Sequence, residues 1–160
     1  MNDRVEIIET LGRYARAAES RDGETLATLF TEDAEVEVSS RYGQEPYEPP
    51  HIGIRGRDQI RDMFTKGAMP LGRGMHYLTT DHIVEIDGDE ATLHAQFLIV
   101  ASAANARPDG GWPAGSDLMQ GTLSPMMIGH YQSRLRKREG RWRFTSHKVK
   151  HSLPLASPPA

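Results

Sequence analysis

The sequence has no cysteine, no long apolar run and no block of charge of one sign. Without cysteine, disulfide bonds and thiolate chemistry are excluded. No segment is apolar over the length of a membrane span, and the first residues lack the apolar stretch of a signal peptide, so we expect a cytoplasmic protein without membrane contact. The 19 basic and 22 acidic residues are interleaved and leave a net charge of -3, which argues against nucleic acid as a partner.

The length of 160 residues is typical of one domain, which would bury roughly 70% of the surface that the unfolded chain exposes. We expect a single domain over residues 1–153 and a proline-rich tail over residues 154–160. The balanced charge favours a small and roughly neutral substrate.

Helical periodicity, caps and breakers divide the first half of the chain into helices, a strand and a loop. The three prolines and three glycines of residues 40–56 interrupt both periodicities and predict a long loop. The other predicted segments are a helix at 3–21, a helix at 24–30 with Asp22 as N-cap, a strand at 34–39, and a helix at 57–66 that Gly67 ends.

Four long alternating segments follow, joined by turns that contain aspartate, glutamate and glycine, which is the pattern of antiparallel hairpins. The predicted strands are 75–86, 91–102, 122–137 and 141–151. Helices followed by antiparallel strands indicate an α+β domain in which the helices pack on one face of a curved sheet. The loop at 104–121 contains Trp112 and is either a cover over a site or a solvated connection.

Glu19 is the most informative residue of the first predicted helix. At about 100° per residue, it falls beside Leu11, Ala15 and Ala18 on the apolar face. Burying a carboxylate is costly without a partner, and the C-terminal end of a helix disfavours negative charge. These two penalties predict a partner and a functional role for Glu19.

His76 is the partner that we expect. In the strand 75–86 the even-numbered residues form a mostly apolar face, and His76 is one of them. A two-residue turn within 87–90, without a bulge, places Phe97 and Ile99 on the same face. Such a histidine is either a hydrogen-bonded core residue or the base of a carboxylate–histidine pair, and Glu19 makes the second interpretation as strong as the first.

Other catalytic motifs are weak. The seven histidines lack the spacing of a metal site, so we expect no metal. No G-x-S-x-G elbow is present, so a serine nucleophile is not expected. The arginine-rich turn between the last two strands is better explained as a solvated face than as a nucleic-acid platform.

The order and spacing of several short motifs resemble the SnoaL-like branch of the NTF2-like superfamily. The motifs are YARAAESRDGETL from Tyr14, LFTEDA from Leu29, GIRG from Gly53, His76, IDGDEA from Ile86, GHY from Gly129 and GRWRF from Gly140. The resemblance covers nearly all of residues 3–150. It implies a cone-shaped α+β barrel, with three N-terminal helices packed on a strongly curved and mostly antiparallel sheet, and a homodimer or a homotrimer.

Two members of this superfamily, scytalone dehydratase and hexachlorocyclohexane dehydrochlorinase, carry an aspartate–histidine dyad. The matching positions here hold Glu19 and His76, with glutamate in place of aspartate. The resemblance therefore implies a lyase, such as a dehydratase, or an isomerase that needs no cofactor. His76 is its general base, Glu19 orients the ring, and the substrate is a small apolar molecule, aromatic or alicyclic.

The residues expected to bind the substrate are Tyr14, Leu78, Phe97, Ile99, Trp112 and His147. Two other functions stay open for this superfamily. One is a non-catalytic ligand-binding or partner subunit, like the β subunit of a ring-hydroxylating dioxygenase, in which Glu19 and His76 form a structural ion pair. The other is a polyketide cyclase or hydrolase.

Overall fold

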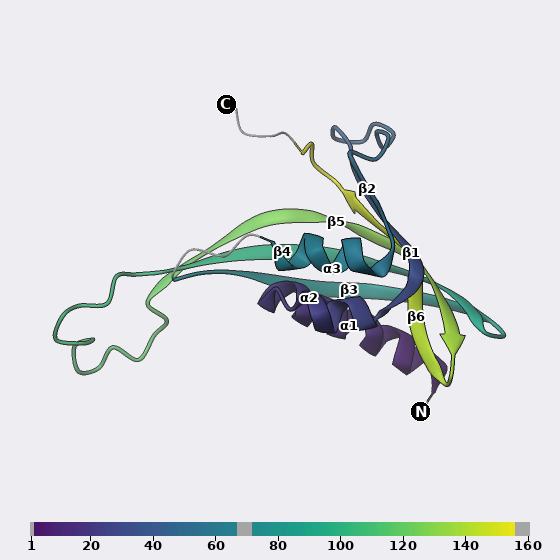
Figure 1. The fold of residues 1–160 in the computed structure, drawn as a ribbon. Coiled ribbons are helices and arrows are strands. Elements are labelled where there is room, and N and C mark those ends of the chain that lie inside the picture. Colours follow the sequence, from purple (N-terminus) through teal and green to yellow (C-terminus); the bar gives the residue numbers. More distant parts are fainter. Residues whose placement is uncertain (1, 67–71, 156–160) are drawn as a thin grey trace.

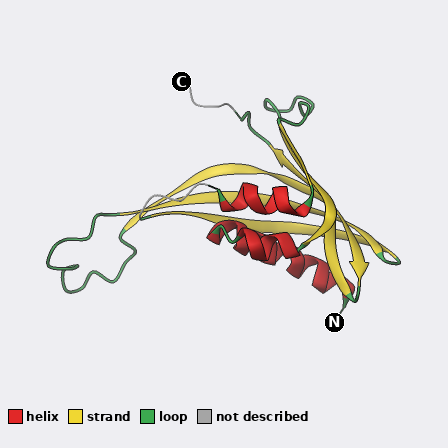
Figure 2. Ribbon diagram, in the orientation of Figure 1, coloured by secondary structure: helices red, strands yellow, loops and turns green. Residues whose placement is uncertain are grey.

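Three helices lie on one face of a single curved sheet of six strands (Figure 1, Figure 2). This computed structural model describes residues 2–66 and 72–155, so the predicted helix end at Gly67 and most of the predicted tail lie outside the described residues. The elements are α1 (Asp3–Ser20), α2 (Gly23–Thr28), β1 (Phe30–Ser40), β2 (Ile52–Arg55), α3 (Arg57–Thr65), β3 (Arg73–Asp87), β4 (Glu90–Ala104), β5 (Gly121–Arg138) and β6 (Arg141–His151). The predicted α+β class is confirmed.

Helix α1 covers nearly all of the predicted segment 3–21 and is capped at both ends. The Asn2 side chain caps it by accepting a hydrogen bond of 2.9 Å from the Arg4 N–H. Arg21 ends it in the left-handed conformation, with φ of 55°. The predicted cap of α2 is also confirmed, because Asp22 Oδ1 accepts a hydrogen bond of 2.9 Å from the Thr25 N–H.

The sheet has the order β2-β1-β6-β5-β4-β3, with β2 and β3 at its edges, so it curves without closing into a barrel among the described residues. All neighbouring strands are antiparallel except β1 and β6, which pair in parallel. The predicted loop at 40–56 contains β2, which pairs with β1. None of the described helices combines the length and the apolar character that crossing a bilayer requires.

The hairpin turn determines which side chains of β3 point toward each face of the sheet, and a β-bulge in β3 reverses this assignment beyond it. Near the turn, Val84 lies opposite Leu93, as a two-residue turn predicts. The register shifts between Thr80 and Ile83, and Asp81 in this segment has φ of 55°. Aspartate is among the few residues besides glycine that tolerate this left-handed conformation. Beyond the bulge, each side chain of β3 therefore points to the other face.

The bulge makes the predicted face of His76 wrong. His76 lies opposite Val100, and Tyr77 lies opposite Ile99. Phe97 and Ile99 are buried, so the face toward the helices carries Tyr77 rather than His76. Because of this change of register, the interpretation of His76 as an inward-facing core residue is also wrong.

The core is aromatic and centred on Tyr14 of α1. This side chain contacts four aromatic rings edge to face and lies 4.5 Å, between ring centroids, from His147 of β6. The four rings are those of Phe30, Phe64, Tyr131 and Phe144. The loop between β4 and β5 extends far from this core, beyond the ends of the helices (Figure 1).

Candidate functional site

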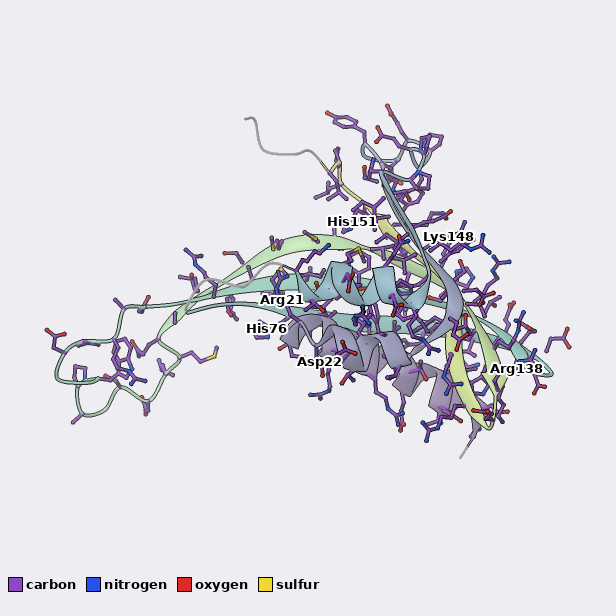
Figure 3. The ribbon with its side chains drawn as sticks, viewed as in Figure 1. Arg21, Asp22, His76, Arg138, Lys148 and His151 are labelled. Atoms are coloured by element: carbon purple, nitrogen blue, oxygen red, sulfur yellow. The ribbon has the colours of Figure 1, made fainter. Side chains whose placement is uncertain are left out.

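Glu19 and His76 are in contact, although 57 positions separate them in the chain. Glu19 comes from the last turn of α1, and His76 comes from the edge strand β3, which packs beside that helix. His76 Nδ1 lies 2.9 Å from Glu19 Oε1. Figure 3 shows His76 at the C-terminal end of α1.

This contact fixes the proton on the ring. A carboxylate only accepts hydrogen bonds, so Nδ1–H is the donor to Glu19. In the neutral ring, Nε2 is then an acceptor. Nε2 lies 3.0 Å from the Ser102 hydroxyl oxygen, which donates to it. A chain of carboxylate, imidazole and hydroxyl results.

The expected burial of this pair is wrong. The side chain of Glu19 is 40% exposed and that of His76 is 45% exposed. The physical reason is position, because the last turn of α1 lies against an edge strand rather than against the centre of the sheet. The apolar face of α1 is instead formed by Ile7, Leu11, Tyr14 and Ala18, which are buried.

An apolar cavity of about 230 Å³ lies between the helices and the inner face of the sheet. Its lining residues come from α1, α3 and the strands, and they include Tyr14, Ala18, Met63, Tyr77, Ile99, Met127, Tyr131 and His151. Ala18 and Tyr77 are the chain neighbours of Glu19 and His76, but neither member of the pair is among the lining residues. The pair therefore borders this cavity from outside.

Only two of the predicted binding residues, Tyr14 and Ile99, line this inner cavity. Phe97 and His147 are buried but do not line it. Leu78 is 54% exposed, because its side chain follows the same altered face as His76. Trp112 lies in the loop between β4 and β5, where it is 37% exposed.

His147 is a neutral core residue. It is fully buried, and its Nδ1 lies 2.8 Å from the Ser133 hydroxyl. Its Nε2 is buried and has no hydrogen-bond partner among the described residues. Burial lowers the pKa of His147 to about 3, because the charged ring would lose its solvation. Burial likewise raises the pKa of Tyr14 and Tyr131, so both phenols stay protonated.

A second hollow, of about 260 Å³, has Ser102 among its lining residues but neither His76 nor Glu19. Ser102 and Arg73 line it, together with apolar residues next to the long loop. The apolar members are Ala103, Ala104, Met119 and Leu123. A larger hollow of about 740 Å³ near the start of α1 is lined by charged residues such as Glu6 and Arg141, away from the pair.

Ser102 and Tyr77 are the residues that sequence reasoning missed. Without a bulge, the hairpin turn predicts that Ser102 points to the opposite face from His76. The sequence also lacks the G-x-S-x-G motif that would mark a serine as part of a site. The bulge pairs Ser102 with Gly74, two residues from His76 on the same face. The polar Thr-Thr-Asp-His run in this strand is only a weak signal for an irregularity.

No three histidine, aspartate or glutamate side chains within residues 2–66 and 72–155 are grouped so as to hold a metal ion.

The family model of the SnoaL-like domain matches residues 1–148. The chain belongs to the SnoaL-like domain family. This membership confirms the resemblance and agrees with the helices and curved sheet described above. No curated protein matches this SnoaL-like chain with significance.

Solved structures share the fold over nearly the whole chain. A Mycobacterium tuberculosis protein of unknown function is 27% identical with a TM-score of 0.66, and the match covers 92% of this chain and 70% of that one. A proposed scytalone dehydratase of Novosphingobium aromaticivorans is 20% identical with a TM-score of 0.66 and coverage of 94% and 85%. The β subunit of a proposed aromatic-ring-hydroxylating dioxygenase from the same organism is 14% identical, with a TM-score of 0.69 and coverage of 97% and 92%. These likenesses show the fold and leave the function to the site.

Proposed function

We propose that this SnoaL-like protein is a cofactor-independent lyase or isomerase in which His76 removes a proton from a small apolar substrate. The observation that supports this most is the hydrogen bond of 2.9 Å between Glu19 Oε1 and His76 Nδ1. It leaves Nε2 as a proton acceptor, which is the state that a general base needs.

Glu19 acts through His76 and is a positioning residue. It selects the tautomer of the ring and stabilises the imidazolium that forms when Nε2 takes the proton. The substrate displaces the Ser102 hydroxyl from Nε2, because a serine side chain can rotate to another rotamer. A positioned histidine base contributes about 10²- to 10⁴-fold to the rate.

The reacting atom of the substrate approaches from the hollow that Ser102 lines. This assignment follows the direction of Nε2, which points to Ser102 rather than to the inner cavity. The apolar lining of Ala103, Met119 and Leu123 favours an apolar substrate, aromatic or alicyclic.

The exposure of the pair argues against a purely structural role. Ion pairs that are this accessible contribute about 0–1 kcal/mol to stability. A contact of that size does not explain a carboxylate at the unfavourable end of a helix.

The experiment is an elimination assay with nitrobenzisoxazole, a generic substrate that a base opens to a coloured phenolate. His76→Ala is expected to lower the rate over buffer by at least about 100-fold. His94→Ala is the matched control, because His94 is an exposed histidine of β4 outside the site. Equal rates for the wild type and His76→Ala would overturn the assignment of the base.

The alternative is a non-catalytic ligand-binding or partner subunit, with the ligand in the inner cavity. One observation favours it, because neither Glu19 nor His76 lines the apolar cavity. An apolar dye that binds this protein, together with elimination that is the same with and without His76, would support it. A polyketide cyclase or hydrolase is a further proposal for the same base, and product identification with a polyketide substrate would distinguish it from a lyase.

A further inference from the structure

Ser102 lies at the end of a hydrogen-bonded chain of three side chains. The general base proposed above uses only the other two, Glu19 and His76. Glu19 Oε1, His76 Nδ1 and Nε2, and Ser102 Oγ follow one another at 2.9 Å and 3.0 Å. Carboxylate, imidazole and hydroxyl in this order are the parts of a nucleophilic triad. Such triads are recognised by geometry and role, because they occur on unrelated folds and in different chain orders.

The three side chains come from three elements, and the bulge at Asp81 brings two of them together. Glu19 ends α1, His76 lies in β3, and Ser102 lies in β4 opposite Gly74. Because β3 and β4 pair through their backbones, the distance between His76 and Ser102 is set by the sheet rather than by a loop. A nucleophile and its base on such a support keep their geometry.

Gly74 keeps the hydroxyl accessible. A Cβ atom at this position would lie 2.8 Å from Ser102 Oγ and 3.5 Å from His76 Nε2. Any larger residue would therefore cover the two reacting atoms. The glycine opens one side of the hydroxyl, and the hollow of about 260 Å³ that Ser102 lines has room for a small acyl group.

We propose that Ser102 is a nucleophile, activated by His76 and Glu19, for acyl transfer from small apolar esters. Ser102 Oγ forms a bond to the ester carbonyl carbon while its proton passes to His76 Nε2. The tetrahedral intermediate then loses its alcohol, which takes that proton. Water attacks the acyl-serine in the same way, releases the carboxylic acid and restores the hydroxyl.

A purely positioning role for Ser102, in which the hydroxyl only holds the ring, predicts no covalent chemistry at Oγ.

The experiment that tests this inference is covalent labelling of the full chain with diisopropyl fluorophosphate. In this reaction Ser Oγ bonds to phosphorus and fluoride leaves. Mass spectrometry of the intact chain and of its peptides is expected to find one adduct, at Ser102. His76→Ala, which keeps Ser102, is expected to label at least about 100-fold more slowly, and Ser102→Ala is expected to carry no adduct.

Two further variants sharpen the result. Ser124→Ala removes an exposed serine of the neighbouring strand β5 and is expected to label like the wild type. Gly74→Ala is expected to abolish labelling by covering Ser102 Oγ, and circular dichroism spectra show whether each variant is folded. An adduct elsewhere, no adduct, or equal labelling of His76→Ala would overturn the inference.

The inference rests on the Glu19–His76 pair of the proposed function, and the two assays separate their failures. Elimination that depends on His76 without an adduct at Ser102 would refute the nucleophile and leave the base in place. The opposite outcome is an adduct at Ser102 that depends on His76, together with an elimination rate that does not depend on His76. It would refute the lyase or isomerase and leave the nucleophile in place.

Discussion

Glu19 Oε1 and His76 Nδ1 lie 2.9 Å apart, and this hydrogen bond determines which nitrogen of the ring is basic. We expect nitrogen-15 NMR of the wild type to show His76 with its proton on Nδ1. In Glu19→Gln the amide can turn either its oxygen or its nitrogen toward the ring, so a mixture of tautomers is expected. His94 serves as the internal reference, and an unchanged His76 signal in Glu19→Gln would contradict the contact.

The stability of the fold is expected to depend little on the same contact. Glu19→Gln should change the free energy of unfolding by less than about 1 kcal/mol, because both side chains are almost half exposed. Urea unfolding at neutral pH measures this. A loss of about 3 kcal/mol or more would indicate a buried structural pair and would favour the binding-subunit alternative.

Asp81 is expected to tolerate glycine but not valine. Its φ of 55° costs a β-branched residue about 1–2 kcal/mol, whereas glycine adopts it freely. Both substitutions remove the Asp81 carboxylate, which accepts a hydrogen bond from Thr80, so their difference isolates the backbone conformation. Thermal unfolding of the two variants measures it. Equal stability of the two would show that the bulge is not held in this conformation.

His147 makes the fold less stable as the pH falls below the ordinary histidine value. Its pKa is about 3 in the folded protein and 6.5 when unfolded, so between these values only the unfolded chain takes up the proton. The contribution is complete above pH 6.5 and is lost as the pH falls from 6.5 toward 3. A single such group costs about 2 kcal/mol between pH 6.5 and pH 5.

The His147→Phe variant tests this because it fills the site without a titrating group. Its free energy of unfolding in urea is expected to fall less than that of the wild type between pH 6.5 and pH 5. The lowered pKa of His151 acts in both proteins and cancels in the comparison. If the free energy of unfolding of His147→Phe fell with pH as steeply as that of the wild type, another group would be the cause.

The outer face of the sheet is expected to carry the contact of a homodimer or homotrimer. Leu78, Leu98 and Ile128 lie opposite one another on three neighbouring strands. Leu78 is 54% exposed and Ile128 is 47% exposed, which is unusual for adjacent apolar residues at the centre of a strand face. Ile128→Asp should convert the oligomer to a monomer in light scattering, whereas Thr122→Asp, on the same strand, should not. A wild-type monomer would contradict the expectation.

The sequence by itself determined the local elements of this protein. Helix α1 follows from its apolar spacing, α2 follows from its Asp22 cap, and the two hairpins follow from turns that contain aspartate, glutamate and glycine. Each of these depends on residues close together in the chain, which is why periodicity and turn chemistry predict them. The cost of a lone carboxylate on an apolar helix face led to the pairing of Glu19 with His76, and the resemblance to a family added their roles as orienting group and base.

Only the tertiary structure decided which atoms meet at the site. A hairpin turn sets the register only as far as the first irregularity, and Asp81 takes its left-handed conformation at too little cost to leave a clear signal in the sequence. That one residue moved His76 away from Phe97 and Ile99 and brought it to Ser102. The parallel pairing of β1 with β6 and the edge position of β3, which left Glu19 half exposed, depend on contacts between distant segments, and no local pattern encodes them.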